Sequence, residues 1–292
     1  MGPAHWVAIA NIIAKHYLDY DGFVVMMGTD TMGYAASALS YLLENLGKTV
    51  CLTGAMVPLA EPYNDARRNV IVSGLVAAYL DVPEVVVFMN RSVFRGNRTM
   101  KVHNGGLKAY DSPNYPALAS LTTKLVPYPS RWRPQASARL RVQQTWESNI
   151  AVVKLVPGYC DDMLIKGLVS TPGLKGIVLE VLGTGNVGRQ KAPLIAALKA
   201  AVHAGIVVVG TTQCSKGSVS WDTYAAGAVL GAAGVLSAQD MTTEAAVTKL
   251  GWLLGRPGLS TPEVRALFLK DLRGELTALQ GEDEARYTFS KL

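Results

Sequence analysis

Short apolar runs alternate with helical segments along most of this chain, and this alternation restricts the folds open to it. The runs "FVVMM" at 23–27, "TVCLT" at 49–53 and "VVVFM" at 85–89 are rich in β-branched residues and end close to turn residues. The segment between the first two runs carries Leu39, Leu42, Leu43 and Leu46 at helical spacing and ends at Gly47, where we expect the helix C-terminus. Strands that alternate with helices pair in parallel and are covered by those helices, so we expect the first run to be buried on both faces. The sequence therefore predicts an α/β protein with parallel sheets.

The alternation divides the chain into two parts. Between residues 94 and 127 it gives way to loops and short extended pieces, and it resumes from residue 150. We predict an N-terminal α/β domain over residues 1–130, a linker over residues 131–149 and a C-terminal α/β domain over residues 150–292. The longest uncharged stretch, residues 223–239, is rich in Ala and Gly, so we predict a pair of closely packed helices there and no membrane span.

The composition excludes several classes of protein. With 49% hydrophobic and 17% charged residues among 292, the chain is typical of compact globular proteins. Its cysteines, Cys51, Cys160 and Cys214, form no CxxC pair, which predicts a reducing compartment and no disulfide framework. The four histidines lack a metal-ligand spacing, so we expect no metal site.

One local cluster of positive charge lies in "RWRPQASARLR", and it consists of Arg131, Arg133, Arg139 and Arg141. Pro134 and small residues interrupt it, and no alternation of basic and aromatic residues accompanies it. We therefore interpret the cluster as a solvated linker, and we expect no nucleic-acid partner.

The sequence "GTDT", Gly28 to Thr31, directly follows the first apolar run and precedes a helical pattern. Ligands of open parallel sheets bind at the carboxyl ends of the strands, which is where this sequence falls. The helix N-terminus favours anionic groups, so Asp30 should stay ionised and can hold a substrate ammonium. Thr29 can orient a water, act as a nucleophile or relay a proton if a base is near. The competing interpretation, that Thr29 or Asp30 only caps the helix, is slightly favoured by this segment alone.

A lysine adds a second polar group. Lys101 lies in the loop-rich stretch "RGNRTMKVHN" after the last strand of the first half. A lysine carried into a cleft loses hydration, and its pKa falls toward the range of a general base. Thr, Lys and Asp together can hydrolyse an amide without a histidine, although a surface lysine is the ordinary alternative.

The stretch "VLGTGNVGRQ" matches G-x-G-x-x-G through Gly183, Gly185 and Gly188. A dinucleotide-binding turn needs an acidic residue about twenty residues further on, but no Asp or Glu occurs between Glu180 and Asp222. We interpret this stretch as a glycine-rich loop that shapes a cleft, and we expect no nicotinamide cofactor.

Several of these segments together resemble the bacterial-type L-asparaginase family, in its cytosolic branch. The similar segments occur in the family's order and are "GTDTMGYAASALSYLLENLGK", "LTGAMVPL", "NDARRNV", "RGNRTMKVHN", "VPGYCDDML", "TGN", "TTQCSKGSV", "MTTEAAVTKLGWLLG" and "LRGELT". The resemblance implies two α/β domains, the larger of them N-terminal. It also implies hydrolysis of L-asparagine to aspartate and ammonia, in some members with L-glutamine as a side substrate. The family uses no cofactor and forms dimers or tetramers.

The resemblance also implies roles for individual residues. Thr29 corresponds to the threonine that orients or activates the attacking water. Asp30 corresponds to the carboxylate that binds the substrate's α-ammonium, and Gly28 belongs to the same substrate-binding motif. Lys101 corresponds to the lysine of the Thr-Lys-Asp relay. Asn186 lies in a loop that approaches a neighbouring subunit's site in relatives.

The sequence also departs from the family pattern. The family begins with a strand that ends in a threonine-bearing "TGGTI" motif, followed by a lid with a tyrosine and an Asp-Ser pair, and these motifs do not occur here. We therefore expect the first strand and the usual nucleophile to be missing, and this chain to have little or no activity. Met27 replaces a usual His. Met100 and Glu180 replace the Thr and Arg of an allosteric asparagine site, so we expect no such site.

Three alternative functions remain at this stage. The chain can be a non-catalytic binding or assembly protein that keeps the family's fold. It can be the ammonia-producing subunit of a transfer-RNA amidotransferase, although the transfer-RNA-facing domain is absent. The glycine-rich loop alone would suggest a nucleotide-dependent oxidoreductase, which tight NAD binding would reveal.

Overall fold

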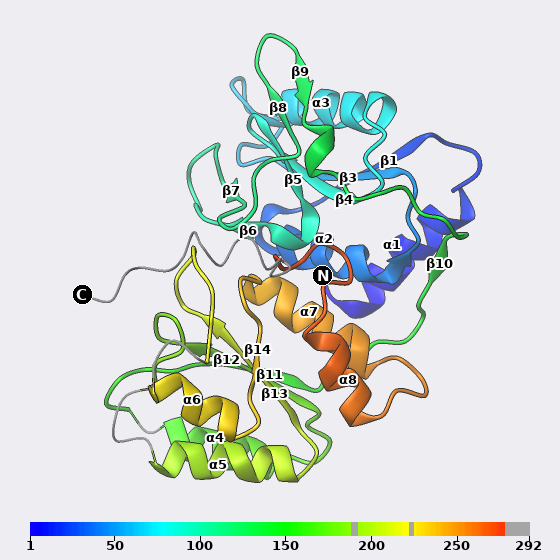
Figure 1. Ribbon diagram of the computed structural model, residues 1–292. Coiled ribbons are helices and arrows are strands. Elements are labelled where there is room, and N and C mark those ends of the chain that lie inside the picture. Colours follow the sequence, from blue (N-terminus) through cyan, green and yellow to red (C-terminus); the bar gives the residue numbers. More distant parts are fainter. Residues whose placement is uncertain (160, 188–191, 222–224, 278–292) are drawn as a thin grey trace.

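Two sheets organise the computed structural model, which describes residues 1–159, 161–187, 192–221 and 225–277 (Figure 1). The first sheet runs in the order β1-β3-β4-β5-β8-β9. Its strands are β1 (Gly22–Met26), β3 (Thr49–Thr53), β4 (Val85–Met89), β5 (Ser92–Arg95), β8 (Ala119–Leu121) and β9 (Leu125–Pro127). The strands β1, β3 and β4 pair in parallel, whereas β5, β8 and β9 continue the sheet antiparallel. The first sheet is mixed because Asn90 and Arg91 form a connection that is too short for a parallel crossover.

Helices cover both faces of the first sheet. Figure 1 shows α1 (Pro3–Lys15) and α2 (Met32–Leu42) on the face toward the second sheet, and α3 (Ala66–Tyr79) on the opposite face. The short 3-10 helices η1 (Thr29–Thr31), η2 (Gly96–Arg98) and η3 (Pro129–Arg131) lie in the connections. Two small antiparallel pairs complete this part: β2 (Leu43–Glu44) with β10 (Arg141–Val142), and β6 (Met100–Lys101) with β7 (Tyr110–Asp111).

The second sheet is entirely parallel among the residues described. Its order is β11-β12-β13-β14, formed by β11 (Ile150–Lys154), β12 (Gly176–Val181), β13 (Val207–Thr212) and β14 (Leu236–Ser237). The remaining helices are α4 (Asp161–Val169), α5 (Ala192–His203), α6 (Ala225–Ala232), α7 (Thr243–Leu254) and α8 (Thr261–Phe268). In Figure 1, α4, α5 and α6 lie on the side away from the first sheet, and α7 lies between the two sheets. The predicted two-sheet α/β fold is confirmed, while the residue limits of the two domains stay predictions.

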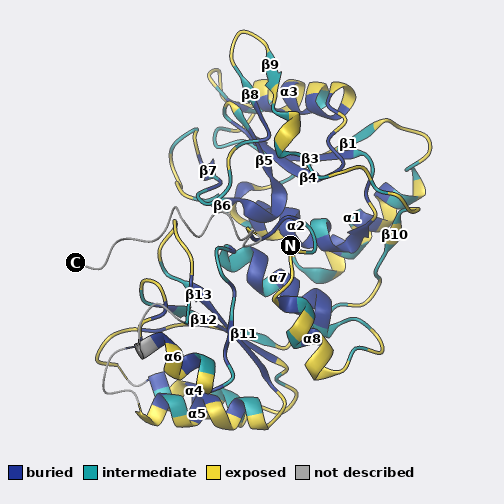
Figure 2. Ribbon diagram, viewed as in Figure 1, coloured by how far each residue is buried: buried dark blue, intermediate teal, exposed yellow. Residues whose placement is uncertain are grey.

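One hydrophobic core connects the two sheets. Leu39 and Leu42 of α2 and Leu250 and Leu253 of α7 are buried in the same cluster, which also contains Val209 of the second sheet. Figure 2 shows α2 and much of α7 buried between the sheets. Because every residue of α2 except Tyr34 and Ser40 is buried, the helix that follows "GTDT" is held firmly in the core.

The first apolar run differs from its prediction. Val24 and Met26 of β1 are 37% and 66% exposed, so the expectation of burial on both faces is wrong. β1 stands at the edge of the sheet described, and α3 approaches its first residue closely. A Cβ added to Gly22 would lie 2.1 Å from the carbonyl oxygen of Ala77 in α3, so this close approach requires glycine.

The helix after "GTDT" ends earlier than predicted. α2 stops at Leu42 because Leu43 and Glu44 pair with β10, and Asn45 then adopts a left-handed conformation with φ 60°. Gly47 is therefore not the helix C-cap, and its N–H donates to the Tyr17 hydroxyl at 2.7 Å.

The Ala- and Gly-rich stretch is a helix followed by a strand. The described part of residues 223–239 forms α6, a turn at Gly234 with φ 86°, and β14, so the predicted helix pair is wrong. Gly234 allows the left-handed turn that returns the chain to the sheet. No described helix is both long and apolar enough to cross a membrane.

The arginine-rich linker is partly docked onto the molecule. Arg131 donates to the Ala117 carbonyl at 2.7 Å, and Arg133 donates to the Leu272 carbonyl at 3.1 Å. Arg141 lies 4.0 Å from Glu44, and Arg139 is exposed. The prediction of a solvated linker therefore fails for Arg131 and Arg133, whose donors bond to carbonyls from other segments.

Two cysteines fall within the described part of the chain. Cys51 is a buried free thiol, and burial raises its pKa to about 12. Cys214 is an exposed free thiol, and Cys160 lies outside the described residues.

Candidate active site

The "GTDT" turn connects β1 to α2 at the carboxyl end of the first sheet. Gly28 is extended at φ −61°, and Thr29, Asp30 and Thr31 form η1. Thr29 is 8% exposed, whereas the Asp30 side chain is 92% exposed. A Cβ added to Gly28 would meet no atom within 4 Å, so this position faces open space. The turn thus places a buried hydroxyl beside an accessible carboxylate.

The loop after β3 supports Thr29 from one side. Thr29 Oγ1 donates to the Met56 sulfur at 3.6 Å, and a Cβ at Gly54 would lie 2.4 Å from the Met27 carbonyl. The buried Asp65 carboxylate accepts from the Met56 N–H at 3.1 Å. Gly54 permits the close packing of the two turns, and Asp65 fixes the loop behind Thr29.

Asp65 supports the site and does not cap α3 with its side chain. Its side chain makes no cap bond at the start of α3, and it also accepts from Asn69 Nδ2 at 3.0 Å. Asn69 in turn donates to the Gly54 carbonyl at 2.9 Å. Asn64 instead accepts from the Arg67 N–H at 3.2 Å. The segment "NDARRNV" was part of the resemblance, but its role in supporting the site was missed.

Lys101 reaches the turn from β6, far along the chain. Its Nζ lies 2.9 Å from Thr29 Oγ1 and 2.6 Å from Asp30 Oδ1, and its side chain is 18% exposed. The structure therefore brings together the three residues that the sequence singled out, and the ordinary alternative of a solvated surface lysine does not hold for Lys101.

Tyr110 joins the same cluster and was missed. It pairs with Lys101 across the β6–β7 ladder, and its hydroxyl donates to the Thr29 carbonyl at 2.5 Å and accepts from the Gly33 N–H at 3.0 Å. Burial, followed by the charges of Glu244 and Asp30, raises the pKa of Tyr110, so its hydroxyl remains protonated and can donate. The glycines Gly105 and Gly106 between Lys101 and Tyr110 were a hairpin signal that could have placed Tyr110 here.

The structure contradicts the alternative that Thr29 or Asp30 only caps the helix. Neither η1 nor α2 has a side-chain cap bond, because the Thr29 hydroxyl points to Met56 and Lys101 and the Asp30 carboxylate to Lys101. The two side chains are therefore available for interactions outside the helix.

Acidic side chains from the second region approach the start of α2. Burial raises the pKa of Glu244, and the nearby charge of Glu180 raises it further. A Cβ at Gly33 would lie 3.6 Å from Glu244 Cγ, and Glu180 accepts from the Thr243 hydroxyl at 2.9 Å. Burial and these two carboxylates raise the pKa of Tyr34 as well. The start of α2 thus lies in a negative environment that suits a cationic ligand group.

Asn186 lies on a different element from the other candidate residues. It follows β12 in the second sheet, where Leu182 and Asn186 exchange backbone hydrogen bonds at 3.2 and 2.8 Å. Gly185 has φ 133°, and a Cβ there would lie 2.9 Å from the Trp221 ring. Gly183 and Gly185 thus form a tight turn packed on Trp221, and Gly188 lies outside the described residues.

Comparison with known families agrees with this arrangement. The family described as "Asparaginase, N-terminal" matches residues 1–133, and the "Glutaminase/Asparaginase C-terminal domain" matches residues 149–268. The chain belongs to the asparaginase family. Within it, the chain is an α/β protein of the type I, cytoplasmic-like asparaginases.

Individual asparaginase-family relatives match nearly the whole chain. L-asparaginase 1 of Escherichia coli (strain K12) is 42% identical over 277 residues, which cover 95% of this chain and 81% of that protein. The crystal structure of L-asparaginase I from Vibrio cholerae superposes with a TM-score of 0.87 at 40% identity, covering 95% of this chain and 82% of that one. The 60 kDa lysophospholipase of Mus musculus is 42% identical over 278 residues, 95% of this chain but 49% of that protein. This asparaginase-family chain thus spans about half the length of one of these curated relatives.

Proposed function

We propose that this chain carries the Thr-Lys-Asp part of an L-asparaginase active site, which hydrolyses L-asparagine to L-aspartate and ammonia. L-glutamine is the expected side substrate, the active form is a homodimer or homotetramer, and the setting is cytoplasmic. The proposal is supported most by one observation, the position of Lys101 Nζ within hydrogen-bond distance of both Thr29 Oγ1 and Asp30 Oδ1.

Asp30 is the proposed ammonium-binding group. The Asp30 side chain is 92% exposed. A carboxylate open to solvent can accept a charge-assisted hydrogen bond that the α-ammonium of an amino acid donates. Glu180 and Glu244 add negative charge around the start of α2, which favours the same orientation of the substrate.

Thr29 and Lys101 are the proposed proton-transfer pair. Lys101 donates to Thr29 in its ammonium form, and as a neutral amine it accepts a proton from that hydroxyl or from a water that the hydroxyl orients. The oxygen of the water, deprotonated directly or through the Thr29 hydroxyl, bonds to the amide carbon. The proton then passes to the amide nitrogen, and the C–N bond breaks to give the carboxylate and ammonia. Tyr110 holds the Thr29 backbone, so the hydroxyl keeps a fixed position relative to Lys101.

The test compares two forms of the chain. Release of ammonia from L-asparagine is measured for the 292-residue chain and for the same chain extended by a family N-terminal segment that carries the "TGGTI" motif. We expect little or no release from the first form and clear release from the second. An extended, folded chain that releases no ammonia from either amide would overturn the proposal.

Two variants of the extended chain separate the roles. Asp30→Asn should raise KM more than it lowers kcat, because it weakens the ammonium contact. Thr29→Val should lower kcat, because it removes the hydroxyl and keeps the shape of the side chain. A Thr29→Val variant with an unchanged kcat would exclude Thr29 from the chemistry.

A further inference from the structure

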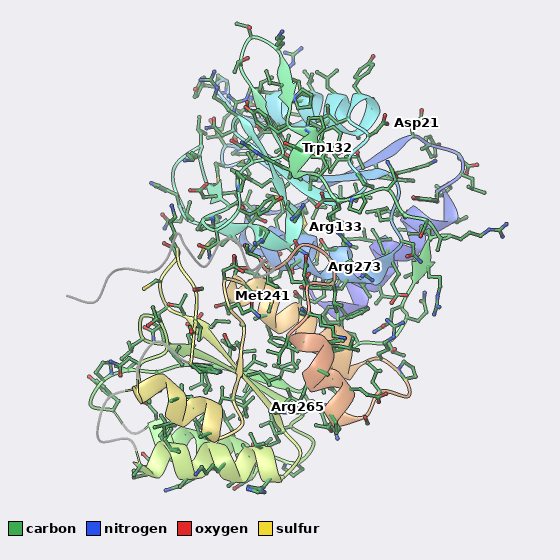
Figure 3. The ribbon with its side chains drawn as sticks, viewed as in Figure 1. Asp21, Trp132, Arg133, Met241, Arg265 and Arg273 are labelled. Carbon is green, nitrogen blue, oxygen red and sulfur yellow. The ribbon has the colours of Figure 1, made fainter. Side chains whose placement is uncertain are left out.

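A polar cavity of about 180 Å³ lies between the first region, the linker and the C-terminal segment of the described chain. The end of α2 and its following turn line one side, the start of β4 and the end of β5 another, and linker residues 133–137 a third. Three arginines line it: Arg95, Arg133 and Arg273. Figure 3 shows Arg133 and Arg273 between the two regions of the molecule.

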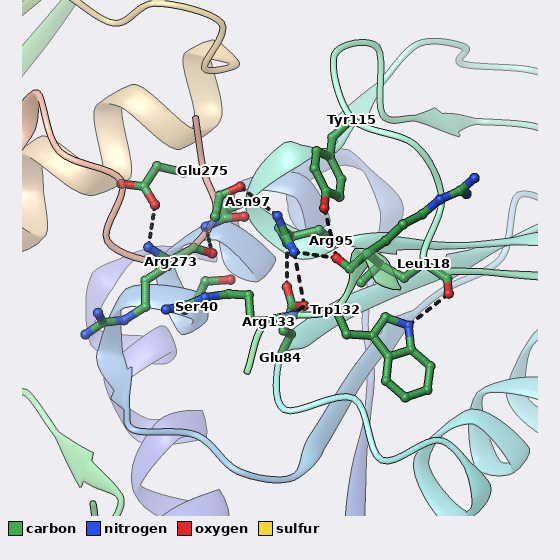
Figure 4. A network of polar contacts seen from close by, with 12 residues as sticks. Ser40, Glu84, Arg95, Asn97, Tyr115, Leu118, Trp132, Arg133, Arg273 and Glu275 are labelled. Carbon is green, nitrogen blue, oxygen red and sulfur yellow. Dashed lines mark hydrogen bonds and ion pairs between the residues drawn. The ribbon is translucent and has the colours of Figure 1, made fainter. Parts of the chain in front are cut away.

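One of the three arginines is fully engaged. Arg95 Nε lies 2.5 Å from Glu84 Oε2, and its Nη atoms donate to Glu84 Oε1, the Gly274 carbonyl and the Arg131 carbonyl. Glu84 Oε1 also accepts from the Arg133 N–H at 2.7 Å (Figure 4). Among the described residues that line the cavity, Glu84 is the sole carboxylate, and its charge is already balanced by Arg95.

The other two arginines have no such partner. Within the described part of the chain, neither Arg133 nor Arg273 has a carboxylate oxygen within 4.0 Å of its guanidinium. Each donates to the Leu272 carbonyl, at 3.1 and 2.9 Å, and Arg273 also holds a buried Nε without an acceptor among those residues. Burial lowers the pKa of Arg273, and the charge of Arg133 lowers it further. The positively charged guanidinium groups of Arg133 and Arg273 therefore repel each other at a cavity that is partly shielded from water.

Nearby carboxylates do not cancel this charge. Glu44 pairs with Arg256 at 2.5 Å, and Glu275 pairs with Lys249. Asp271 interacts with Arg133 at longer range and accepts from the Gly274 N–H at 2.6 Å. When the paired charges are set aside, the described residues around the cavity leave two guanidinium groups, those of Arg133 and Arg273, and one carboxylate, that of Asp271.

We infer that this cavity is a binding site for a small oxyanion, of the phosphate or dicarboxylate type, held by Arg133 and Arg273. Guanidinium groups offer planar pairs of donors that match the oxygen atoms of such anions. An amino acid does not fit, because its ammonium would find no unengaged carboxylate in the described lining. The site thus selects a chemistry different from that proposed at Asp30, and it does not depend on the proposed hydrolysis.

The test measures anion binding to the 292-residue chain by calorimetry at constant ionic strength, with inorganic phosphate and succinate as probes. We expect one of the two probes to bind, and the tighter one identifies the oxyanion type. R133Q and R273Q should each weaken binding at least about tenfold, since each removes a charge-assisted contact.

Matched controls make the result specific. R139Q removes an exposed arginine of the same linker that does not line the cavity, so its binding should equal that of the parent chain. If R133Q does not fold, R133K replaces it, since it keeps the charge and loses the planar donor pair, and it should weaken binding several-fold. An excess of L-asparagine should not displace the anion.

Three results would overturn the inference. The first is the absence of binding of both probes to the parent chain. The second is equal binding by R133K, R133Q or R273Q and the parent chain. The third is displacement by L-asparagine, which would place the anion beside Thr29 instead. A chain without amidase activity that still binds the anion would leave the inference intact, so the two proposals fail separately.

Discussion

Two lysine–carboxylate pairs in this molecule have opposite surroundings. Lys101 and Asp30 lie 2.6 Å apart, with side chains 18% and 92% exposed, whereas Lys249 and Glu275 are both 0% exposed. The first pair joins β6 to η1 beside Thr29, and the second joins α7 to the C-terminal segment in the core between the sheets. A ligand can therefore reach the first lysine–carboxylate pair, whereas the second pair contributes only to the stability of the fold.

The two pairs differ in their contribution to stability because they differ in their contact with water. An exposed pair contributes little to stability because water screens both charges, and removing one partner leaves the other solvated. A buried pair that loses one partner leaves an uncompensated charge in the core, which is costly. We therefore expect substitutions at Lys101 to affect chemistry and substitutions at Lys249 to affect folding.

The largest expected effect is on catalysis at the exposed pair. Lys101→Met, in the form of the chain that releases ammonia, should lower kcat/KM about ten-thousandfold, as removal of a member of a catalytic relay does. The free energy of unfolding should change by less than about 1 kcal/mol. Steady-state ammonia release and urea unfolding measure the two quantities. A variant that is inactive only because it is unfolded would break the comparison.

The next effect is on stability at the buried pair. Lys249→Met should lower the free energy of unfolding by about 3–5 kcal/mol, because Glu275 is left charged in the core. Lys166→Met provides the control, since Lys166 and Asp162 form a surface pair at 3.3 Å, and it should cost less than about 0.5 kcal/mol. Similar losses in the two variants, measured by urea unfolding, would contradict the assignment of Glu275 to a closed environment.

A smaller effect is expected at Tyr110, which holds the backbone of the site in place. Tyr110→Phe leaves the Thr29 carbonyl and the Gly33 N–H without their shared partner, which should cost about 1–3 kcal/mol of stability. Ammonia release should fall roughly tenfold, because Thr29 loses its fixed position. The hydroxyl of Tyr128 bonds to the Ser120 side chain at 2.8 Å and to no residue of the site among those described, so Tyr128→Phe should leave ammonia release unchanged. Equal loss of activity in both variants would remove Tyr110 from the site.

The smallest effect is a difference in acid sensitivity. Burial alone would raise the pKa of Glu275, but the charge and hydrogen bond of Lys249 outweigh it, and the pKa lies below its ordinary value. The ionised Glu275 therefore contributes to the free energy of unfolding above about pH 4.3, the ordinary glutamate pKa. This contribution is lost as the pH falls through the lowered pKa of Glu275 in the folded protein. Urea midpoints measured from neutral pH to pH 3 should fall less steeply in Lys249→Met than in the parent chain. Parallel curves would show that Lys249 does not govern the titration of Glu275.

The sequence predicted well those features that depend on local pattern. Alternating apolar runs gave two α/β regions, and the strand-to-helix position of "GTDT" together with Lys101 gave three side chains that do meet. Tyr110 was missed because its role depends on the pairing of β6 with β7. Each of these strands has two residues, which is too short for a periodic pattern in the sequence. Gly47 was misplaced because an antiparallel pair with β10, about a hundred residues away, ends α2 early.

Charge was harder to interpret than hydrophobic pattern. Arg131 and Arg133 looked like solvated linker residues, but carbonyls from distant segments accept their donors. The role of Asp65 was missed, because its carboxylate binds the loop that supports Thr29. Such partners are set by tertiary contacts, so composition and spacing alone do not reveal them.

The last described residues of the chain complete the first region, and this has a consequence for biosynthesis. Arg95 donates to Gly274, Asn97 to Arg273 and Arg98 to Thr277, so buried donors before and within η2 find their acceptors 176–179 residues later. At a translation rate of about 5–20 residues per second, the nascent first region waits roughly 10–35 seconds for these acceptors to be made. During synthesis the donor atoms of these three bonds therefore leave the ribosome before their acceptors exist, and a chaperone that binds nascent chains has that interval in which to act.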